Sequence, residues 1–352
     1  MQALTQKNWW DPDLYRQKLP FRKARLKTIR RIRRFFEEQD FTEVDTPALQ
    51  VSPGLEVHLK AFQTELDEPF GQGEQTRYLH TSPEFTMKKL LTAGLERIFQ
   101  IAHVYRNEER GRTHHPEFTM LEWYRAGATY SAMMDDTEAL VKACAEALGV
   151  SKLQFNGRTA DPFCPWCRLT VQDAFLNYTG IDVLATIPEK VSMEPDPSLL
   201  RREAEKIGIW TSPADRWEDI FFRIMLEKIE PKLGDDIPVI LCEYPTCLGA
   251  LARKKPEDER VVERFEAYIC GVELCNAFSE LTDPVEQEAR FVYDMSIKEK
   301  LYKERYPIDT DFLAALQHGM PAAAGNAIGV DRLVMLLTGA DRIEDVLWAP
   351  VV

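Results

Sequence analysis

The chain has 352 residues, enough to bury a substantial core in one large domain or two modest ones. Its formal net charge of −13 argues against a general nucleic-acid binder, which would need a basic face. The sequence lacks an apolar run of the ~20 residues that a membrane span needs, and its first ten residues lack the apolar core of a signal peptide. The seven cysteines, an odd number, predict reduced thiols and a cytoplasmic protein rather than a disulfide framework.

The first predicted element is a helix over residues 20–39, with Pro20 near its start. Ten Lys or Arg residues and no acid lie between Arg16 and Arg34. These basic residues form either the solvated face of an amphipathic helix or a docking stripe for an acidic partner. The apolar residues expected to face the core are Leu26, Ile29, Ile32, Phe35 and Phe36.

Strands and helices alternate in the rest of the chain. In chain order, the pattern predicts a strand over 77–81, a helix over 83–91 with Ser82 as N-cap, a hairpin of 97–106 with 116–125, a helix over 131–148 ended by Gly149, a helical and loop-like stretch over 150–235, and strands at 237–243 and 261–275. The last 25 residues read as a strand, a Gly-rich turn and a helix. Antiparallel strands with long helical excursions indicate an α+β fold, which we expect to form a single domain over 1–352.

One close cysteine pair occurs in Cys164-Pro-Trp-Cys167. A zinc site normally has four ligands, and the sequence offers no second Cys/His pair at a useful spacing. A surface loop, half a metal site and a redox pair therefore remain open as interpretations.

The most informative segment runs from Arg106 to Tyr124. In a strand, every second side chain lies on the same face, so Phe118, Glu122 and Tyr124 would share one. Together the segment offers a cation for a phosphate or carboxylate, an aromatic ring for a base, and a carboxylate with a phenol for an amine. These are the groups needed to join ATP to an amino acid.

This segment resembles motif 2 of class II aminoacyl-tRNA synthetases, in particular of the lysyl group. Residues 41–47 resemble motif 1, the dimer-forming element, and residues 329–333 resemble motif 3. The three occur in the family's order, with Thr81-Ser-Pro-Glu84 between the first two. The resemblance implies an antiparallel β-sheet flanked by helices, and a homodimer.

The resemblance also implies ATP and Mg²⁺ as cofactors. Arg106 and Arg332 would be catalytic, because they would neutralise charge that develops on the phosphates. The implied ATP-binding residues are Arg106, Asn107, Glu108, His114, His115, Phe118, Glu273, Leu274, Gly329 and Arg332. The implied substrate-binding residues are Ser82, Pro83, Glu84, Glu122, Tyr124, Asn276, Glu280 and Ala327.

Glu266 and Glu273 are the expected magnesium ligands. A two-residue turn at Cys270-Gly271 would place residue 268 opposite residue 273, with Glu266 as a diagonal neighbour. Carboxylates this close repel each other unless a cation lies between them, and Mg²⁺ prefers oxygen ligands that it shares with phosphates. Glu273 and Asn276 can line one cleft only if their strand is bulged or bent.

Three residues depart from the family pattern. His115 stands where Asn is usual, and Ala277 and Ala327 stand where Gly is usual. A methyl group at Ala327 would crowd the amino group of an α-amino acid and leave room for an amine displaced by one carbon.

Motif 1 begins by residue 41, so we expect no anticodon-binding barrel and no recognition of a tRNA anticodon. That pattern is typical of synthetase paralogues that modify translation elongation factor P. The resemblance then implies that (R)-β-lysine is activated as an adenylate and passed to the ε-amine of an elongation factor P lysine, with no membrane partner. An enzyme that charges tRNA with lysine and a catalytically inactive regulatory paralogue are the alternatives.

Overall fold

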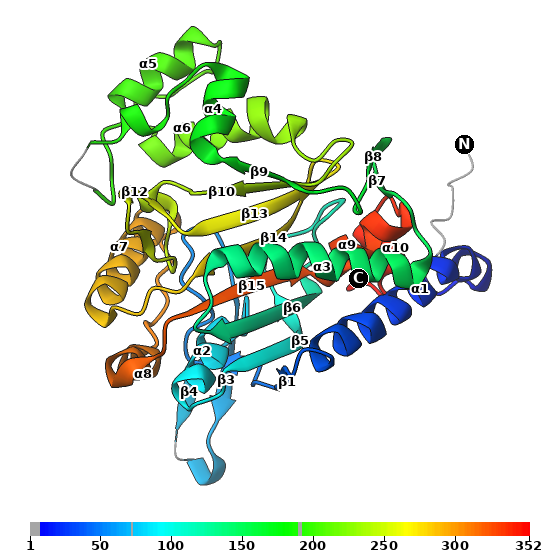
Figure 1. Cartoon of the computed structure of the whole chain (residues 1–352). Coiled ribbons are helices and arrows are strands. Elements are labelled where there is room, and N and C mark those ends of the chain that lie inside the picture. The colour runs from blue at the N-terminus through cyan, green and yellow to red at the C-terminus, as the bar shows by residue number, and fades with distance from the viewer. Residues whose placement is uncertain (1–7, 72, 189–191) are drawn as a thin grey trace, which may run out of the picture.

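The computed structural model describes residues 8–71, 73–188 and 192–352, so most of the N-terminal segment used for the signal-peptide prediction lies outside the described residues. The centre of the fold is an eight-stranded sheet in the order β1-β5-β6-β15-β14-β13-β10-β9 (Figure 1). The two outermost pairs are parallel and the other five are antiparallel, which confirms the predicted α+β fold. The strands are β1 (Thr42–Glu43), β5 (Arg97–Tyr105), β6 (Glu117–Ala126), β9 (Cys167–Thr170), β10 (Val239–Cys242), β13 (Arg264–Ile269), β14 (Val272–Ser279) and β15 (Ala323–Gly329).

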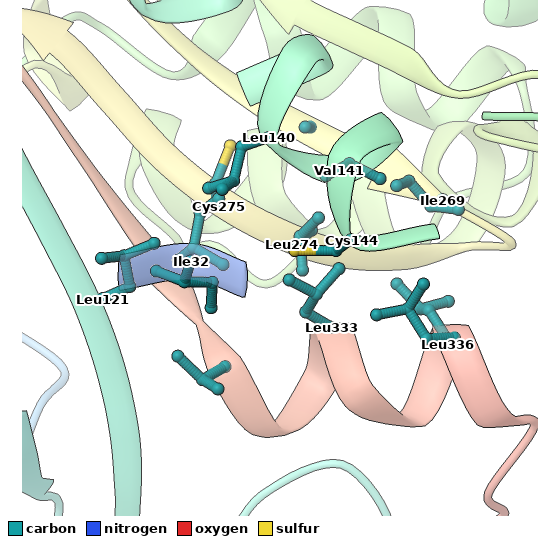
Figure 2. Packing of buried hydrophobic residues seen from close by; sticks show 14 of the residues in the cluster. Ile32, Leu121, Leu140, Val141, Cys144, Ile269, Leu274, Cys275, Leu333 and Leu336 are labelled. Atoms are coloured by element: carbon teal, nitrogen blue, oxygen red, sulfur yellow. The ribbon is translucent and has the colours of Figure 1, made fainter. Parts of the chain in front are cut away.

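One face of the sheet is covered by four helices that pack on one another and on the strands (Figure 1). They are α1 (Pro12–Glu37), α3 (Tyr130–Leu148), α9 (Val330–Thr338) and α10 (Ile343–Val346). Figure 2 shows their shared core, in which Ile32 of α1, Leu140 of α3 and Leu333 of α9 meet Leu121 of β6. As predicted, α3 ends where Gly149 adopts the left-handed conformation, with φ of 68°.

The opposite face carries α2 (Glu84–Thr92), α7 (Pro284–Tyr302) and α8 (Thr310–Gly319). A small sheet in the order β2-β4-β3 lies near them, formed by Leu49–Gln50, Glu74–Leu79 and Phe62–Asp67. A second core lies on this face, where Phe85, Phe291 and Phe312 pack near Tyr124. Because neighbouring residues of a strand point to opposite faces, Trp123 belongs to the first core and Tyr124 to the second.

The stretch over 150–235 contains more strand than expected. It includes α4 (Val171–Thr179), α5 (Ser198–Lys206) and α6 (Trp217–Ile224), which share a separate core with β10 and β13 near the β9 edge of the sheet (Figure 1). It also includes β7 (Leu153–Phe155), β8 (Arg158–Ala160) and β9, so the helical and loop-like prediction was wrong there. Such short strands carry little periodicity, and β9 is specified by its long-range pairing with β10. Outside this stretch, β11 (Lys254–Lys255) and β12 (Asp258–Val262) form a separate pair.

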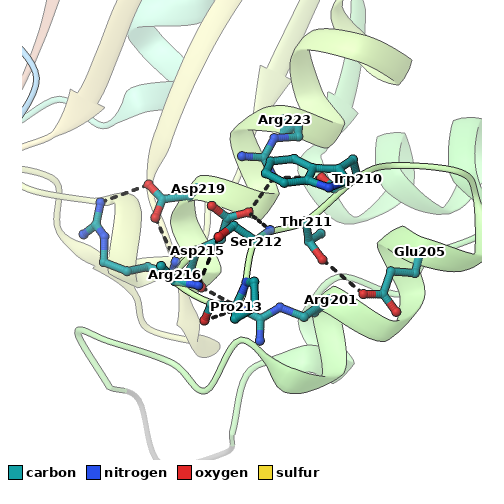
Figure 3. A network of polar contacts seen from close by, with 11 residues as sticks. Arg201, Glu205, Trp210, Thr211, Ser212, Pro213, Asp215, Arg216, Asp219 and Arg223 are labelled. Carbon is teal, nitrogen blue, oxygen red and sulfur yellow. Dashed lines mark hydrogen bonds and ion pairs between the residues drawn. The ribbon is translucent and has the colours of Figure 1, made fainter.

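A polar network fixes the loop between α5 and α6 (Figure 3). Arg223 donates to the Asp215 carboxylate at 2.6 Å, and that carboxylate also accepts the backbone N–H of Ser212 at 2.7 Å. Arg201 donates to the backbone carbonyl of Asp215 at 2.8 Å. These bonds give the polar groups of this turn partners within the protein, where they would otherwise be hydrogen-bonded to water.

Helix α1 begins at Pro12 rather than at Pro20. The Asp11 side chain accepts the N–H groups of Asp13 and Leu14, both at 3.1 Å, and so caps the helix earlier than predicted. Pro20 lies inside the helix.

The buried face of α1 also differs in part from the expected one. Ile32, Phe35 and Phe36 are buried as expected, and Ile29 packs against the same core. Leu26 is 40% exposed, so its assignment to the core was wrong. Two arginines of the basic stretch are buried instead: Arg22 donates to the carbonyl of Leu347 at 2.7 Å, and Arg25 pairs with Asp331.

None of the described helices combines the length and the apolar character that crossing a bilayer requires.

Candidate active site

A cavity of about 210 Å³ opens where β6, β14 and β15 meet the start of α2 and the loop after β5. It lies on the face of β6 that carries Phe118, Met120, Glu122 and Tyr124, all of which line it as the strand pattern predicted. The other predicted residues in its wall are Ser82, Glu84, Arg106, His114, His115, Glu273, Leu274, Asn276, Glu280, Ala327, Gly329 and Arg332.

One end of the cavity is anionic. Glu122 accepts the hydroxyl of Ser82 at 2.7 Å and that of Tyr124 at 2.5 Å, and its side chain is almost fully buried. Burial, followed by the charge of Glu84, raises the pKa of Glu122 to about 8. Burial likewise raises the pKa of Glu280 to about 8. Glu122, which forms no ion pair with any described residue, fits an ammonium ligand, whose charge would ionise it.

A buried lysine that the sequence analysis missed joins the acids at this end. The Nζ atom of Lys88 lies 2.5 Å from Glu84 and 2.5 Å from Glu280, and the side chain is 1% exposed. Lys88 stands four residues after Glu84 on α2, a spacing that brings side chains together and that the sequence displayed. Glu84 and Glu280 therefore share a resident cation.

The other end of the cavity is cationic and begins at Arg106, directly after β5. Its guanidinium carbon lies 5.1 Å from the centre of the Phe118 ring. Its Nε is buried and has no hydrogen-bond partner among the described residues, and the nearest acid, Glu109, lies 4.0 Å away. A buried donor without a partner is costly, so Arg106 is suited to receive a carboxylate or phosphate oxygen.

Arg332 provides the second cation from the first turn of α9. It donates to the carbonyls of Glu273 at 2.8 Å and Thr113 at 3.3 Å, and its third nitrogen lies 2.8 Å from His114. Desolvation and the charge of Arg332 lower the pKa of His114, so the imidazole remains neutral beside the guanidinium.

Asp331, the residue before Arg332, fixes this turn. Its buried carboxylate pairs with Arg25 of α1 and accepts the N–H of Thr119 in β6 at 2.7 Å. The sequence analysis gave Asp331 no role, because its partners lie 306 and 212 residues away in the chain.

Four predicted residues lie outside the cavity wall. Pro83 precedes α2, and Asn107 and Glu108 follow Arg106 on the surface, where Glu108 binds Lys60 at 2.8 Å. The fourth, Glu266, is described below. By contrast, His115 lines the cavity, but it accepts the N–H of Val351 at 3.1 Å and contacts the carbonyl of Glu117, so both ring nitrogens are occupied.

The hairpin of β13 and β14 contains the bulge that the sequence required. Residue 268 pairs with Glu273 as predicted, but residue 267 then pairs with Cys275, so Leu274 is the extra residue. This bulge brings Glu273 and Asn276 into the same cavity. It also makes Asn276 rather than residue 275 the direct partner of Glu266, while Glu273 stays close enough for its charge to act on Glu266.

Glu266 is held by three donors. Its oxygens accept from Arg264 at 2.6 Å, Tyr244 at 2.6 Å and Tyr268 at 2.7 Å. A carboxylate has about four acceptor positions, so one remains for a cation. Glu273 is more open, with 44% of its side chain exposed.

A third acid lies in the same field. Burial, followed by the charges of Glu266 and Glu273, raises the pKa of Glu230 to about 7. No group of three or more His, Cys, Asp or Glu side chains in the described residues is spaced to hold a metal ion. Glu266 and Glu273 thus fit Mg²⁺ in the way it binds nucleotides, with one or two carboxylates and the remaining ligands from phosphates and water.

The two alanines that depart from the family pattern have different surroundings. Ala327 lies in β15 between Glu122 and Asn276 and lines the cavity, so its methyl group faces the ligand space. Ala277 is 1% exposed and belongs to the helix-covered core on the other face of the sheet. Only Ala327 is placed to select a substrate.

Cys164 and Cys167 do not line this cavity. Cys164 donates weakly to Asp161 at 3.4 Å, and Cys167 begins β9. All seven cysteines are free thiols, which leaves the loop, metal and redox interpretations of this pair open.

Residues 13–352 match the family of class II tRNA synthetases (D, K and N). The chain belongs to this family. It is 38% identical over 330 residues to the elongation factor P–(R)-β-lysine ligase of Vibrio cholerae, covering 93% of this chain and 94% of that enzyme. It is 37% identical over 345 residues to the ligase of the same name from Haemophilus influenzae, covering 98% of each chain.

A lysine–tRNA ligase is similar to nearly the same degree. The enzyme of Pelotomaculum thermopropionicum is 37% identical over 334 residues, which are 93% of this chain but 62% of that enzyme. Identity alone therefore does not separate the two kinds of relative, and the shape and charge of the cavity must be considered with it.

Proposed function

We propose that this protein is an ATP-dependent ligase that activates (R)-β-lysine as an adenylate and transfers it to the ε-amino group of a lysine on translation elongation factor P. The observation that carries the proposal is the charge pattern of one cavity. Glu122 and Glu280 lie at one end, Arg106, with its unpartnered Nε, lies at the other, and Glu84 lies where its charge reaches both Glu122 and Glu56. A diamino acid has two ammonium groups and one carboxylate, which match these two ends. Relatives of nearly equal length that carry this ligase name support the choice of substrate and partner.

In the first half-reaction, a carboxylate oxygen of the amino acid attacks the α-phosphorus of ATP and pyrophosphate leaves. Arg106 would bind the reacting carboxylate and the α-phosphate, where negative charge grows in the transition state. Arg332 would bind the terminal phosphate, and Phe118 would stack on adenine. No protein side chain acts as the nucleophile, so the chain's contribution is positioning and charge neutralisation.

Mg²⁺ would be held by Glu273 and by the remaining acceptor position of Glu266. When bound, it supplies positive charge to the phosphates of ATP. Its presence would also relieve the repulsion among Glu230, Glu266 and Glu273, which the raised pKa of Glu230 reflects.

In the second half-reaction, the ε-amine of the protein lysine attacks the carbonyl carbon of the adenylate. A C–N bond forms, AMP leaves with the electron pair of the broken C–O bond, and the attacking nitrogen loses a proton.

We also propose that four further residues contact ATP or substrate when these are bound: Pro83, Asn107, Glu108 and His115.

Two assays test the proposal. Pyrophosphate exchange into ATP should require a lysine isomer and Mg²⁺, and it should be faster with (R)-β-lysine than with α-lysine. The intact mass of elongation factor P should rise by one lysyl unit after incubation with enzyme, ATP and (R)-β-lysine. Exchange without transfer to elongation factor P, together with charging of tRNA by α-lysine, would instead support a lysine–tRNA ligase.

We also propose that the chain acts in the cytoplasm as a homodimer, and that residues 1–352 form one catalytic unit. The free cysteines support the first point. The resemblance of residues 41–47 to motif 1 and the exposed apolar Leu26 on the preceding helix α1 support the second. Analytical ultracentrifugation at micromolar concentration should give the mass of two chains, and a monomer mass would reject the dimer.

A further inference from the structure

A partly buried acid beside the reacting end of the cavity has no role in the function proposed above. Glu56 lies in the loop that follows β2 and shares the cavity wall with Ser82, Glu84 and Arg106. Its Oε2 is buried and has no hydrogen-bond partner among the described residues. A buried carboxylate oxygen without a partner is costly, which points to a ligand that satisfies it.

The loop that carries Glu56 is fixed in place. Lys298 of α7 is buried, and its Nζ donates to the backbone carbonyls of Glu56 at 3.3 Å, Val57 at 3.0 Å and Leu59 at 2.5 Å. Because these bonds use backbone carbonyls, they hold the loop and leave Oε2 of Glu56 without a partner among the described residues. A group held this way loses little conformational freedom when it binds a ligand.

The charges around Glu56 are those expected beside an amino acid's reacting end. Burial raises the pKa of Glu56, Glu84 raises it further, and Arg106 and Lys298 lower it. Glu56 is therefore close enough to Glu84 and Arg106 to interact with both. These two residues are the proposed partners of the amine and of the reacting carboxylate, so the same ligand groups would lie within the field of Glu56.

Glu84 alone is poorly placed to neutralise the amine, because it already pairs with Lys88 at 2.5 Å. Glu56 forms no ion pair with any described residue, so no resident cation competes with a ligand amine for its carboxylate. A second cavity of about 10 Å³, enough for about one water, lies against Glu56, Ser82 and Glu84. This space gives the carboxyl group room to turn from Gly54, against which Oε2 now lies, toward the ligand.

We propose that Glu56 is a substrate-binding residue that pairs with the ammonium group next to the reacting carboxylate, as the second anionic partner beside Glu84. The inference rests on the proposed function, since it assumes a lysine isomer in the cavity. It assigns Glu56 to the selection of substrates that carry an amine at this end.

The test compares two ligands that differ only in this amine. 6-Aminohexanoate has the carboxylate and the distal amine of lysine but lacks the amine near the carboxylate. We would measure kcat/KM for (R)-β-lysine in pyrophosphate exchange, and the inhibition constant of 6-aminohexanoate, for the wild type and Glu56→Gln. The substitution should lower kcat/KM for (R)-β-lysine on the order of 10- to 100-fold, mainly through KM, because it breaks a buried charge pair. The inhibition constant of 6-aminohexanoate should stay unchanged.

A matched control removes the same charge nearby. Glu299→Gln alters an acid on the surface of α7, 57% exposed and paired with Arg305, and it should change neither constant. If Glu56→Gln does not fold, Glu56→Asp, which keeps the charge on a shorter side chain, should retain the preference for (R)-β-lysine over 6-aminohexanoate.

Equal weakening of both ligands by Glu56→Gln would overturn the inference, because Glu56 would then only support the loop. The same conclusion would follow if both ligands bound as in the wild type. A wild-type enzyme that shows no exchange with any lysine isomer would instead refute the proposed function, so the two failures are distinguishable.

Discussion

The affinity for (R)-β-lysine should increase with pH between 6.5 and 8. Burial raises the pKa of Glu122 to about 8, so at neutral pH its carboxyl group is mostly protonated in the empty cavity. An ammonium group binds the ionised form, so binding must release this proton. For a group with a pKa of about 8, the ionised fraction rises from about 3% at pH 6.5 to about 50% at pH 8. KM should therefore fall about 15-fold over this range from Glu122 alone.

Burial raises the pKa of Glu280 to about 8 as well, so Glu280 should steepen the dependence, because it responds to the same ligand charge. The assay is pyrophosphate exchange at fixed saturating ATP, with KM for (R)-β-lysine measured at half-unit steps of pH. Isothermal titration calorimetry in two buffers of different ionisation enthalpy should show proton release at pH 7. Glu122→Gln cannot titrate and should flatten the dependence. A KM that is constant between pH 6.5 and 8 in the wild type, or a slope that Glu122→Gln and Glu280→Gln both leave intact, would refute this reasoning.

Three other predictions concern catalysis, specificity and stability. Arg106→Ala should slow pyrophosphate exchange by about 10²–10³-fold, as expected for loss of one transition-state donor, and undiminished exchange would contradict the mechanism. Arg110→Ala, on the surface of the same loop, should leave the rate intact. The wild type should prefer (R)-β-lysine over α-lysine by roughly 10- to 200-fold in kcat/KM, the range that a single methyl group in a pocket can give, and Ala327→Gly should reduce this ratio; an unchanged ratio would exclude steric selection by Ala327. Asp331→Asn should lower the free energy of unfolding by about 3–5 kcal/mol, because it leaves the buried guanidinium of Arg25 unpaired. Denaturant melts should show a much smaller change for the exposed Asp341→Asn, and equal losses would mean that the buried pair contributes no more than a surface one.

The sequence alone was sufficient where the signal is local. The helix that became α3 and its end at Gly149, the hairpin of β5 and β6, and the turn at residues 270–271 all follow from periodicity and turn residues within a few positions of one another. The shared face of Phe118, Glu122 and Tyr124 follows from strand geometry in the same way. These features required no knowledge of what packs against them.

The resemblance to a synthetase family identified most of the residues that line the cavity. It did not predict which of them contact one another. A bulge or bend was required because Glu273 and Asn276 would otherwise point to opposite faces of their strand. Only the pairing of β14 with β13 locates the bulge at Leu274. Glu266 was expected to face a cation, and the fold adds three donors that the sequence did not reveal, Arg264, Tyr244 and Tyr268.

The tertiary structure alone decided which charged groups are buried together. Arg25 reads in the sequence as one more residue of a basic stretch, but it is buried because Asp331, 306 residues away, needs a partner. The roles of Lys88 and Glu56 likewise depend on neighbours that are distant in the sequence and come close only in the folded chain. The cost of burying a charge depends on its surroundings in space, and a sequence pattern records only its surroundings along the chain.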